Sequence, residues 1–237
     1  MKPFRHLFLL LSIFSFLIPH GLFRQIPVTG LNSGSKSDKS QVENLPSLQE
    51  FASKIKPQSG EFIRGIYVKD VLANEIVQQP PGNPGYISRE VDTVTQFGLA
   101  SQFGTIGLLA HNSIAGIAFF NIVAGDIIYL IQSTGELKAY SVSEIQRYQA
   151  LIPTSQYSDF VNLNDPQSII SAQTLFLRTY GRGGVLVLQT CIEEAGEPSW
   201  GRLFIIAEPL PMVANLIRNM KIPAVISLHN FDVVQIN

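Results

Sequence analysis

The stretch Val187-Leu188-Gln189-Thr190-Cys191 has the pattern of a buried strand, and its last residue is the only cysteine of the chain. Eleven residues later, Arg202 opens a second apolar run, Leu203 to Ala207. Short apolar runs bounded by glycine and polar residues are typical of buried strands. Two strands joined by a loop from Ile192 to Gly201 would place Cys191 and Arg202 side by side at one end of a sheet. Positive charge beside a thiol favours the thiolate, which is the nucleophilic form.

A thiol nucleophile also needs a base or an acid, and His111 is the candidate. Three of the four histidines lie near the termini, whereas His111 directly follows the apolar run Gly107 to Ala110. His111 therefore ends a predicted strand, as Cys191 does. A lone histidine is commonly structural, and a free cysteine is commonly a small buried group. A single cysteine with a histidine elsewhere in the chain is also a candidate nucleophile pair.

Composition limits the class of protein. The 237 residues are 46% hydrophobic and 15% charged, which is enough for one domain with a sizeable core plus a tail. The formal net charge of −1 argues against nucleic acid as a partner. One cysteine cannot form an internal disulfide, and the histidines lack the spacing of a zinc site. We therefore predict no metal and no cofactor.

The N-terminal segment has the pattern of a targeting signal. Lys2 and Arg5 precede a block of 12 mostly apolar residues, Leu7 to Ile18. Such a block has the length of a secretory signal core and is shorter than a membrane span of about 20 residues. Residues 1–23 are thus predicted to be either a signal peptide or a signal anchor, which would bring the chain to the membrane. Residues 24–60 are predicted to be a flexible linker, because a polar Ser/Lys stretch dominates their first half.

From residue 62 onward, short runs rich in β-branched and aromatic residues alternate with Gly/Pro turns. This pattern, with few helices, favours a mixed β-barrel over a doubly wound α/β sheet. The stretch 88–103 has mixed helix and loop character. Short helices are predicted over Leu48–Lys56 and from Asp165, where Asp165 is the expected N-cap and Pro166 the first helical residue. Strands are predicted at 62–71, 75–78, 105–110, 127–132, 137–142, 185–191 and 202–207, and a helix followed by two strands at 212–236.

The motifs together resemble one family. The run Leu108-Leu109-Ala110-His111-Asn112, then Val187 to Cys191, then Arg202 resembles the sortases, which are cell-surface cysteine transpeptidases. Val187 stands where the family's Thr-Leu-any-Thr-Cys motif has its first threonine. The resemblance covers roughly residues 62 to 208. It implies an eight-stranded β-barrel as the catalytic domain, residues 61–208, and leaves 209–237 as a C-terminal helix-strand extension packed on the barrel.

The resemblance also implies a chemistry. Cys191 would attack the carbonyl of a Thr–Gly-type bond in a sorting signal and form a thioacyl enzyme, and His111 would protonate the leaving amine. Arg202 would stabilise the negative charge that develops on the substrate carbonyl oxygen. Thr190, Asn112 and Trp200 are the expected substrate-binding residues, although Trp200 could equally be a structural anchor of its loop.

The implied partners are surface proteins that bear a sorting signal and an amine acceptor in the cell wall or on a protein. The implied location is extracytoplasmic, anchored to the membrane or secreted. Two alternatives stay open: a cysteine peptidase that uses water as acceptor, and a non-catalytic, membrane-tethered binding module. Ile26-Pro27-Val28-Thr29-Gly30 itself resembles a sorting signal, so it is either a self-recognition segment cut between Thr29 and Gly30 or a chance match.

Overall fold

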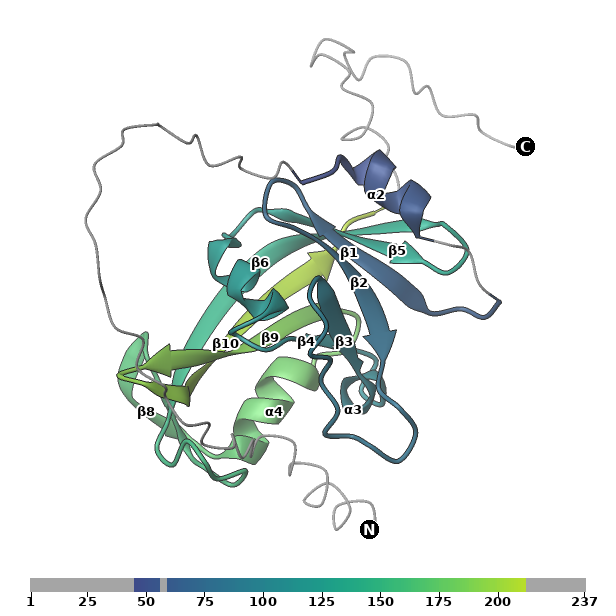
Figure 1. Ribbon diagram of the computed structural model, residues 1–237. Coiled ribbons are helices and arrows are strands. Elements are labelled where there is room, and N and C mark those ends of the chain that lie inside the picture. Colours follow the sequence, from purple (N-terminus) through teal and green to yellow (C-terminus); the bar gives the residue numbers. More distant parts are fainter. Residues whose placement is uncertain (1–44, 56–58, 212–237) are drawn as a thin grey trace, which may run out of the picture.

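The strands close into a barrel. The computed structural model describes residues 45–55 and 59–211. Ten strands form one sheet in the order β10-β9-β4-β3-β2-β1-β5-β6-β7-β8, and a further pairing of β10 with β6 closes the stretch from β10 to β6 into a ring. Eight strands thus make a closed ring of mixed parallel and antiparallel pairs, and β7 and β8 extend from it as an arm (Figure 1). The predicted mainly β, eight-stranded barrel with short helices is confirmed.

The elements that build this ring are short, apart from two long strands. The long strands β6 and β10 pair with each other over most of their length and close the barrel. The strands are β1 (Ile63–Val68), β2 (Leu72–Gln78), β3 (Thr93–Phe97), β4 (Ile106–Leu109), β5 (Ile127–Gln132), β6 (Leu137–Ala150), β7 (Phe160–Asn162), β8 (Asp165–Ile170), β9 (Leu186–Glu194) and β10 (Glu197–Pro209). The helices are α2 (Leu48–Lys54), α3 (Gly98–Ser101), the 3-10 helix η2 (Ala115–Asn121) and α4 (Ala172–Tyr180).

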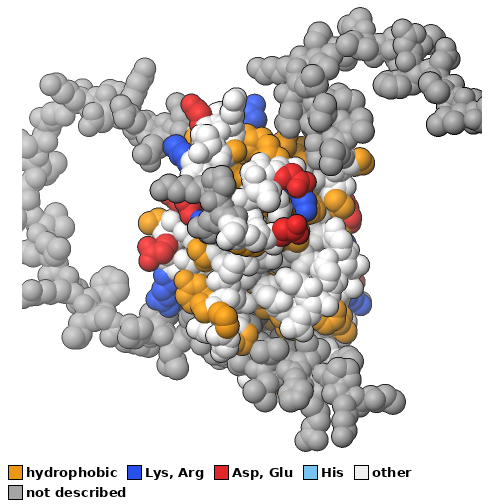
Figure 2. Space-filling model, turned by 90° about the vertical axis from the view of Figure 1, so that its right-hand side faces the viewer, with side chains coloured by type: hydrophobic (Ala, Val, Ile, Leu, Met, Phe, Trp, Pro, Cys, Tyr) orange, Lys and Arg blue, Asp and Glu red, His pale blue; other side chains and the backbone are white. Residues whose placement is uncertain are grey.

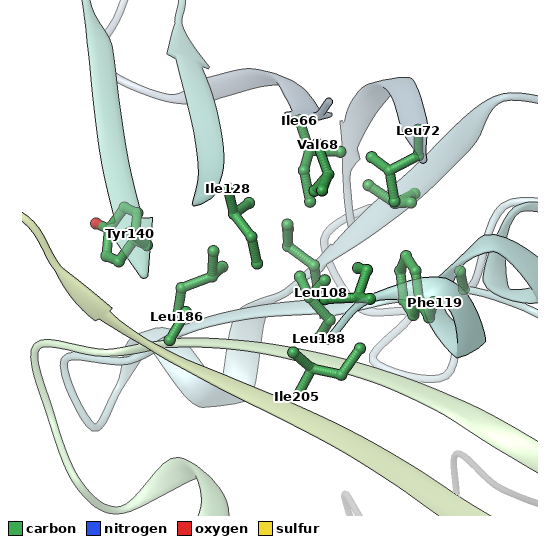
Figure 3. Packing of buried hydrophobic residues seen from close by; sticks show 14 of the residues in the cluster. Ile66, Val68, Leu72, Leu108, Phe119, Ile128, Tyr140, Leu186, Leu188 and Ile205 are labelled. Atoms are coloured by element: carbon green, nitrogen blue, oxygen red, sulfur yellow. The ribbon is translucent and has the colours of Figure 1, made fainter. Parts of the chain in front are cut away.

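The barrel interior is filled by aliphatic side chains from every side of the ring. Figure 3 shows these side chains pointing toward one another from strands far apart in sequence. Leu188 and Ile205 are directly paired across β9 and β10, and both are fully buried. Phe119 of η2 is 1% exposed and belongs to the same cluster, so this 3-10 helix packs on the barrel core. Other members are Ile66, Val68, Leu72, Leu108, Ile128 and Leu186.

A second core lies outside the barrel, between strands β4, β9 and β10 and helix α4. Successive strand residues point to opposite faces, so Val187 and Phe204 face outward when Leu188 and Ile205 face inward. These outward side chains pack against Phe176 and Tyr180 of α4. Ser171 caps this helix by accepting from the Thr174 backbone N–H, and Figure 1 shows α4 lying against the outer side of β9 and β4.

The predicted helix at Leu48–Lys56 is present as α2. Ser47 and Glu50 form a reciprocal capping box at its start. Phe51 and the following Ile55 are each 6% exposed and pack with Tyr67 and Ile131 on the outside of β1 and β5. This stretch of the predicted linker is therefore docked on the barrel.

Three expected elements differ from the structure. Asp165-Pro166 begins strand β8 and not a helix, and the helix starts seven residues later under the Ser171 cap. The stretch 88–103 contains strand β3, which runs parallel to β2, in addition to the short helix α3. The strand predicted over 62–71 ends at Val68, where a turn leads into the β1–β2 hairpin.

The described surface carries mixed charge. On the face in Figure 2, acidic and basic side chains are interspersed with hydrophobic ones. Within residues 45–55 and 59–211, no helix is both long and apolar enough to span a membrane. The predicted segments 1–23 and 212–236 and the motif Ile26–Gly30 lie outside the described residues.

Candidate active site

Cys191 and Arg202 are direct partners across two antiparallel strands. The register of β9 and β10 sets Cys191 opposite Arg202 and Gln189 opposite Phe204. Residues directly opposite each other in such a ladder project to the same face. Both side chains therefore lie on the outer face of the barrel, with Cys191 half-buried and Arg202 only 3% exposed.

The connection between these two residues is a tight hairpin and not the predicted loop from Ile192 to Gly201. β9 continues past Cys191 to Glu194, and β10 begins at Glu197. Ala195 and Gly196 form the turn with φ of 51° and 82°. Two successive positive φ values are those of a type I′ turn, whose twist matches that of the flanking strands. Cys191 therefore lies within a strand and not at its end.

A bulge in β10 decides which residue faces the cysteine. Continued without a break from the pair Glu194 and Glu197, the ladder would place Trp200 opposite Cys191. The register instead shifts between Glu197 and Gly201, and Gly201 pairs with Ile192. Two extra residues in β10 therefore bring Arg202 into line with Cys191. Trp200 lies in this bulged part of the strand, half-buried, which corrects the expectation that it sits in a loop.

The bulge also fixes the guanidinium. Arg202 Nη1 donates to the carbonyl oxygens of Ser199 and Gly201, each at 2.8 Å. The guanidinium carbon lies 5.9 Å from the centre of the Phe160 ring of β7, within the range of a cation–π contact. Main chain on one side and an aromatic ring on the other thus hold the positive charge on the face that carries Cys191.

His111 lies just beyond the end of β4, the strand on the other side of β9. β4 runs parallel to β9 with Leu109 beside Gln189, and the Ala110 N–H continues the ladder by donating to the Gln189 carbonyl at 3.2 Å. His111 is the next residue after this last hydrogen bond, so its backbone lies near the part of β9 that leads to Cys191. A backbone hydrogen bond of His111 with Ile87, which packs on the outer core, places the imidazole on the outer side as well. One row across the sheet is thus formed by the backbone positions of Arg202 on β10, Cys191 on β9 and His111 just beyond the end of β4.

Thr190 has a different place from the one expected. Its side chain alternates with that of Cys191 and points inward, where its hydroxyl donates to the Ala110 carbonyl at 2.9 Å. Gly116 of η2 packs so closely that a Cβ there would collide with the Thr190 hydroxyl and lie 2.7 Å from the His111 carbonyl oxygen. Thr190 therefore holds the chain just before His111, and its role in binding substrate stays a prediction.

Asn112 links the histidine segment to the bulge. Its side-chain Nδ2 donates to the Pro198 carbonyl at 3.1 Å, across strand β9. The same bulge accepts hydrogen bonds from Arg202 at Ser199 and Gly201. The segments that carry the histidine and the arginine are thus held by one piece of main chain, and a direct contact of Asn112 with substrate stays a prediction.

A cavity opens beside this row of residues, between β9, β10, α4 and the segment that joins β6 to β7. About 560 Å³ of space lies between these elements, and this volume includes the open solvent at the mouth of the cavity. Arg202 and Gln189 lie on its strand side, so its floor starts on the same face as Cys191. No local sequence pattern predicts this cavity, because its walls come from five separate segments, one of which is the stretch of β3 and α3 with Phe97 and Leu99. The lining is largely aromatic: Phe97, Phe160, Phe176, Tyr180 and Phe204.

The surroundings of His111 predict a pH dependence of stability. Burial lowers the pKa of His111 below 6.5, Arg89 acts in the same direction, and the backbone hydrogen bond with Ile87 opposes both. As pH falls below 6.5, the unfolded chain takes up a proton at this residue before the folded chain does. The free energy of unfolding should therefore fall from pH 6.5 down through the lowered pKa, with the stabilisation fully present above pH 6.5.

Urea unfolding at a series of pH values, in the wild type and in His111→Gln, measures this contribution. The variant should show a shallower loss of stability over the same window. Equal slopes in both proteins would contradict the burial of a neutral imidazole.

The solved structures similar to this chain include several sortases. Sortase C1 from Streptococcus suis is 14% identical with a TM-score of 0.44, and the match covers 70% of this chain and 80% of that one. Sortase C-1 from Actinomyces oris is 14% identical with a TM-score of 0.40, covering 62% and 73%. Sortase A from Listeria monocytogenes is 16% identical with a TM-score of 0.37, covering 62% and 86%. No protein-family model and no curated protein sequence matches the chain. The structures named here are all of the family that the motifs around His111 and Cys191 resemble.

Proposed function

We propose that the chain is a sortase-like cysteine transpeptidase. The direct pairing of Cys191 with Arg202, with His111 just beyond the end of the neighbouring strand β4, carries this proposal. A nucleophile, an acid–base group and a fixed cation are the three parts that acyl transfer through a thioester needs. The cavity that Arg202 and Gln189 line is the proposed place for the peptide that precedes the cleaved bond.

The first step is attack of the Cys191 sulfur on the carbonyl carbon of a Thr–Gly-type bond. The lowered pKa of His111 keeps its imidazole neutral at pH 7, so it can accept the thiol proton as the C–S bond forms. The imidazolium then gives that proton to the leaving amine as the C–N bond breaks. The products are a thioacyl enzyme and a free amine. His111 is neutral again, because the proton that it took from the thiol has gone to the amine.

The second step reverses the roles. An incoming amine attacks the thioester, the His111 imidazole accepts its proton, and the thiol is released with that proton. Arg202 contributes a charge that is already oriented by two main-chain carbonyls, so little reorganisation is needed when an oxyanion develops. This role of Arg202, like the roles of the other two residues, is part of the proposal.

The partners follow from this chemistry. The donor would be a surface protein with a sorting signal, and the acceptor an amine of the cell wall or of another protein. The N-terminal segment 1–23 would hold the enzyme on the outer side of the membrane or direct its export. A hydrolytic peptidase would share every step except the last, in which water replaces the amine.

The test uses peptides that contain Thr-Gly, starting with Ile-Pro-Val-Thr-Gly, with and without an added amine such as triglycine. A transpeptidase should join the fragment ending in threonine to the amine at the expense of the hydrolysed product, as seen by mass spectrometry. Hydrolysis that is indifferent to the amine would show a peptidase instead. Absence of any cleavage or thioacyl adduct across the peptide series would refute both and leave a binding module.

A further inference from the structure

The bulge that brings Arg202 into line with the cysteine lies between two paired residues of β10, Glu197 and Gly201. A bulge interrupts the ladder, so its peptide groups lose their partners on the neighbouring strand. Pro198 suits this place because it has no N–H to leave unpaired. Gly201 closes the bulge, and a Cβ there would lie only 2.5 Å from the Tyr148 carbonyl oxygen of β6. The ends of the bulge are thus fixed by the strands, and side chains must orient the peptide groups between them.

One of these peptide groups is held from both sides. The Pro198 carbonyl accepts a hydrogen bond from Asn112 Nδ2 at 3.1 Å, and the Ser199 N–H donates to Glu197 Oε1 at 2.9 Å. This carbonyl and this N–H belong to the same planar unit, the Pro198–Ser199 peptide, so the two bonds together fix its rotation. Donation to a carboxylate also polarises the peptide and strengthens its carbonyl as an acceptor. We call this unit the clamped peptide.

The next peptide group carries the contact to the guanidinium. The Ser199 carbonyl follows the clamped peptide directly, and only the two dihedral angles of Ser199 separate the two planar groups. Arg202 Nη1 donates to this carbonyl and to that of Gly201, each at 2.8 Å. A rotation of the clamped peptide would therefore move one of the two acceptors that hold the positive charge.

The donor of the clamp comes from a fixed piece of main chain. Asn112 directly follows His111, whose carbonyl accepts from the N–H groups of Ile114 and Gly116 at 3.0 and 2.9 Å. From this tightened turn, Asn112 reaches past β9 to the bulge in β10. Its amide is thus presented by a backbone that is already ordered, so little freedom is lost when the hydrogen bond forms.

We infer that Asn112 and Glu197 are positioning residues, which hold the Arg202 guanidinium beside the Cys191 sulfur through the clamped peptide. This inference rests on the proposed function, in which the charge of Arg202 acts on chemistry at Cys191. Neither positioning residue has to touch the substrate for this role. Without the clamp, the guanidinium would occupy a wider range of positions, and its average field at the sulfur would fall.

Alkylation of Cys191 in the full chain by a matched pair of reagents tests the inference without requiring peptide cleavage. Iodoacetate is anionic and iodoacetamide is neutral, and both react with the thiolate. The ratio of their rate constants at one pH therefore reports the positive charge held near the sulfur, and changes in the thiolate fraction cancel. Arg202→Met should lower this ratio, and Asn112→Leu should lower it at least about threefold. Adding Asn112→Leu to Arg202→Met should have no further effect, because the clamp acts through Arg202.

Glu197 provides an independent arm of the test. Glu197→Gln and Glu197→Leu remove the same charge, but only glutamine keeps an acceptor for the Ser199 N–H. The ratio should therefore be at least about twofold lower in the leucine variant than in the glutamine variant. Gln78→Leu is the matched control, because Gln78 Nε2 makes a similar bond to the Ile63 carbonyl at 3.2 Å, between β2 and β1. This control should leave the ratio unchanged.

The possible outcomes separate the inference from the proposed function. If Arg202→Met lowers the ratio but Asn112→Leu and the Glu197 pair do not, the inference is overturned and the role of Arg202 stands. An equal effect of Asn112→Leu with and without Arg202 also overturns it. If Arg202→Met leaves the ratio unchanged, the inference and the proposed role of Arg202 both fall. Should Asn112→Leu fail to fold, the Glu197 pair decides. The expected ratios in a protein that cleaves no peptide would refute the proposed function alone.

Discussion

Replacing Cys191 with alanine should reduce kcat/KM for peptide cleavage by at least about 10⁴-fold and abolish the covalent peptide adduct. The sulfur is the atom that forms the thioester, so no neighbouring group can replace it. Cys191 is the only cysteine of the chain, and an adduct seen by intact mass spectrometry is therefore assigned without ambiguity. The measurement combines steady-state cleavage with intact mass after mixing with peptide.

The variant should fold like the wild type, because Cys191 is half-buried and alanine retains its backbone place in β9. Equal thermal midpoints in the two proteins serve as the control. Cysteine to serine is the matched substitution, which keeps the size of the side chain and lowers its nucleophilicity. Cleavage by Cys191→Ala within tenfold of the wild-type rate would remove the cysteine from the mechanism.

Replacing Arg202 with methionine should lower kcat/KM by about 10²- to 10³-fold, which is typical of losing one preorganised group that stabilises an oxyanion. The substitution also removes the Nη1 donor that binds the carbonyls of Ser199 and Gly201. This loss should lower the free energy of unfolding by about 1–3 kcal/mol. Lysine keeps the positive charge but lacks the planar guanidinium with its several fixed donors. The kcat/KM of Arg202→Lys should therefore lie between those of the wild type and Arg202→Met. Rates are measured at a temperature well below the thermal unfolding midpoint of each variant.

Arg182→Met provides the comparison, because Arg182 makes its ion pair with Glu144 at 2.7 Å and is not among the cavity-lining residues. The same chemical change there should alter kcat/KM by less than about threefold. If Arg202→Met retained wild-type kcat/KM, its charge would have no part in the reaction and its role would be to hold the bulge.

Local sequence patterns predicted the parts of the fold that depend on neighbours in the chain. The hairpin of β5 and β6 follows from two apolar runs separated by a Gly-containing turn, and it is present as predicted. Strand β3 was missed because it has only five residues and helix α3 follows it directly. Asp165-Pro166 satisfied the rules for a helix start, but pairing of β8 with β7 determines its structure. Tertiary pairing outweighed local propensity there.

For the site too, the sequence predicted what depends on neighbouring residues and missed what depends on tertiary pairing. The sequence predicted that Cys191 and Arg202 lie side by side, although it expected a loop where the chain forms a tight turn and a bulge. The inward direction of Thr190 follows from strand alternation, which the predicted strand already contained. The alignment of His111 with Cys191 depends on a parallel pairing between strands about 80 residues apart, which no local pattern encodes.

The central claim is that His111, Cys191 and Arg202 form one site, and the pH dependence of Cys191 alkylation tests it most directly. Iodoacetamide labelling of the folded protein is followed by intact mass from pH 5 to 10 in the wild type, in His111→Ala and in Arg202→Ala. We predict that Cys191 reacts readily and that each substitution changes the pH profile of its rate, because each removes a group that acts on the thiol. An inert Cys191, or three superimposable profiles, would contradict the account and leave the cysteine as a packing residue of a binding barrel.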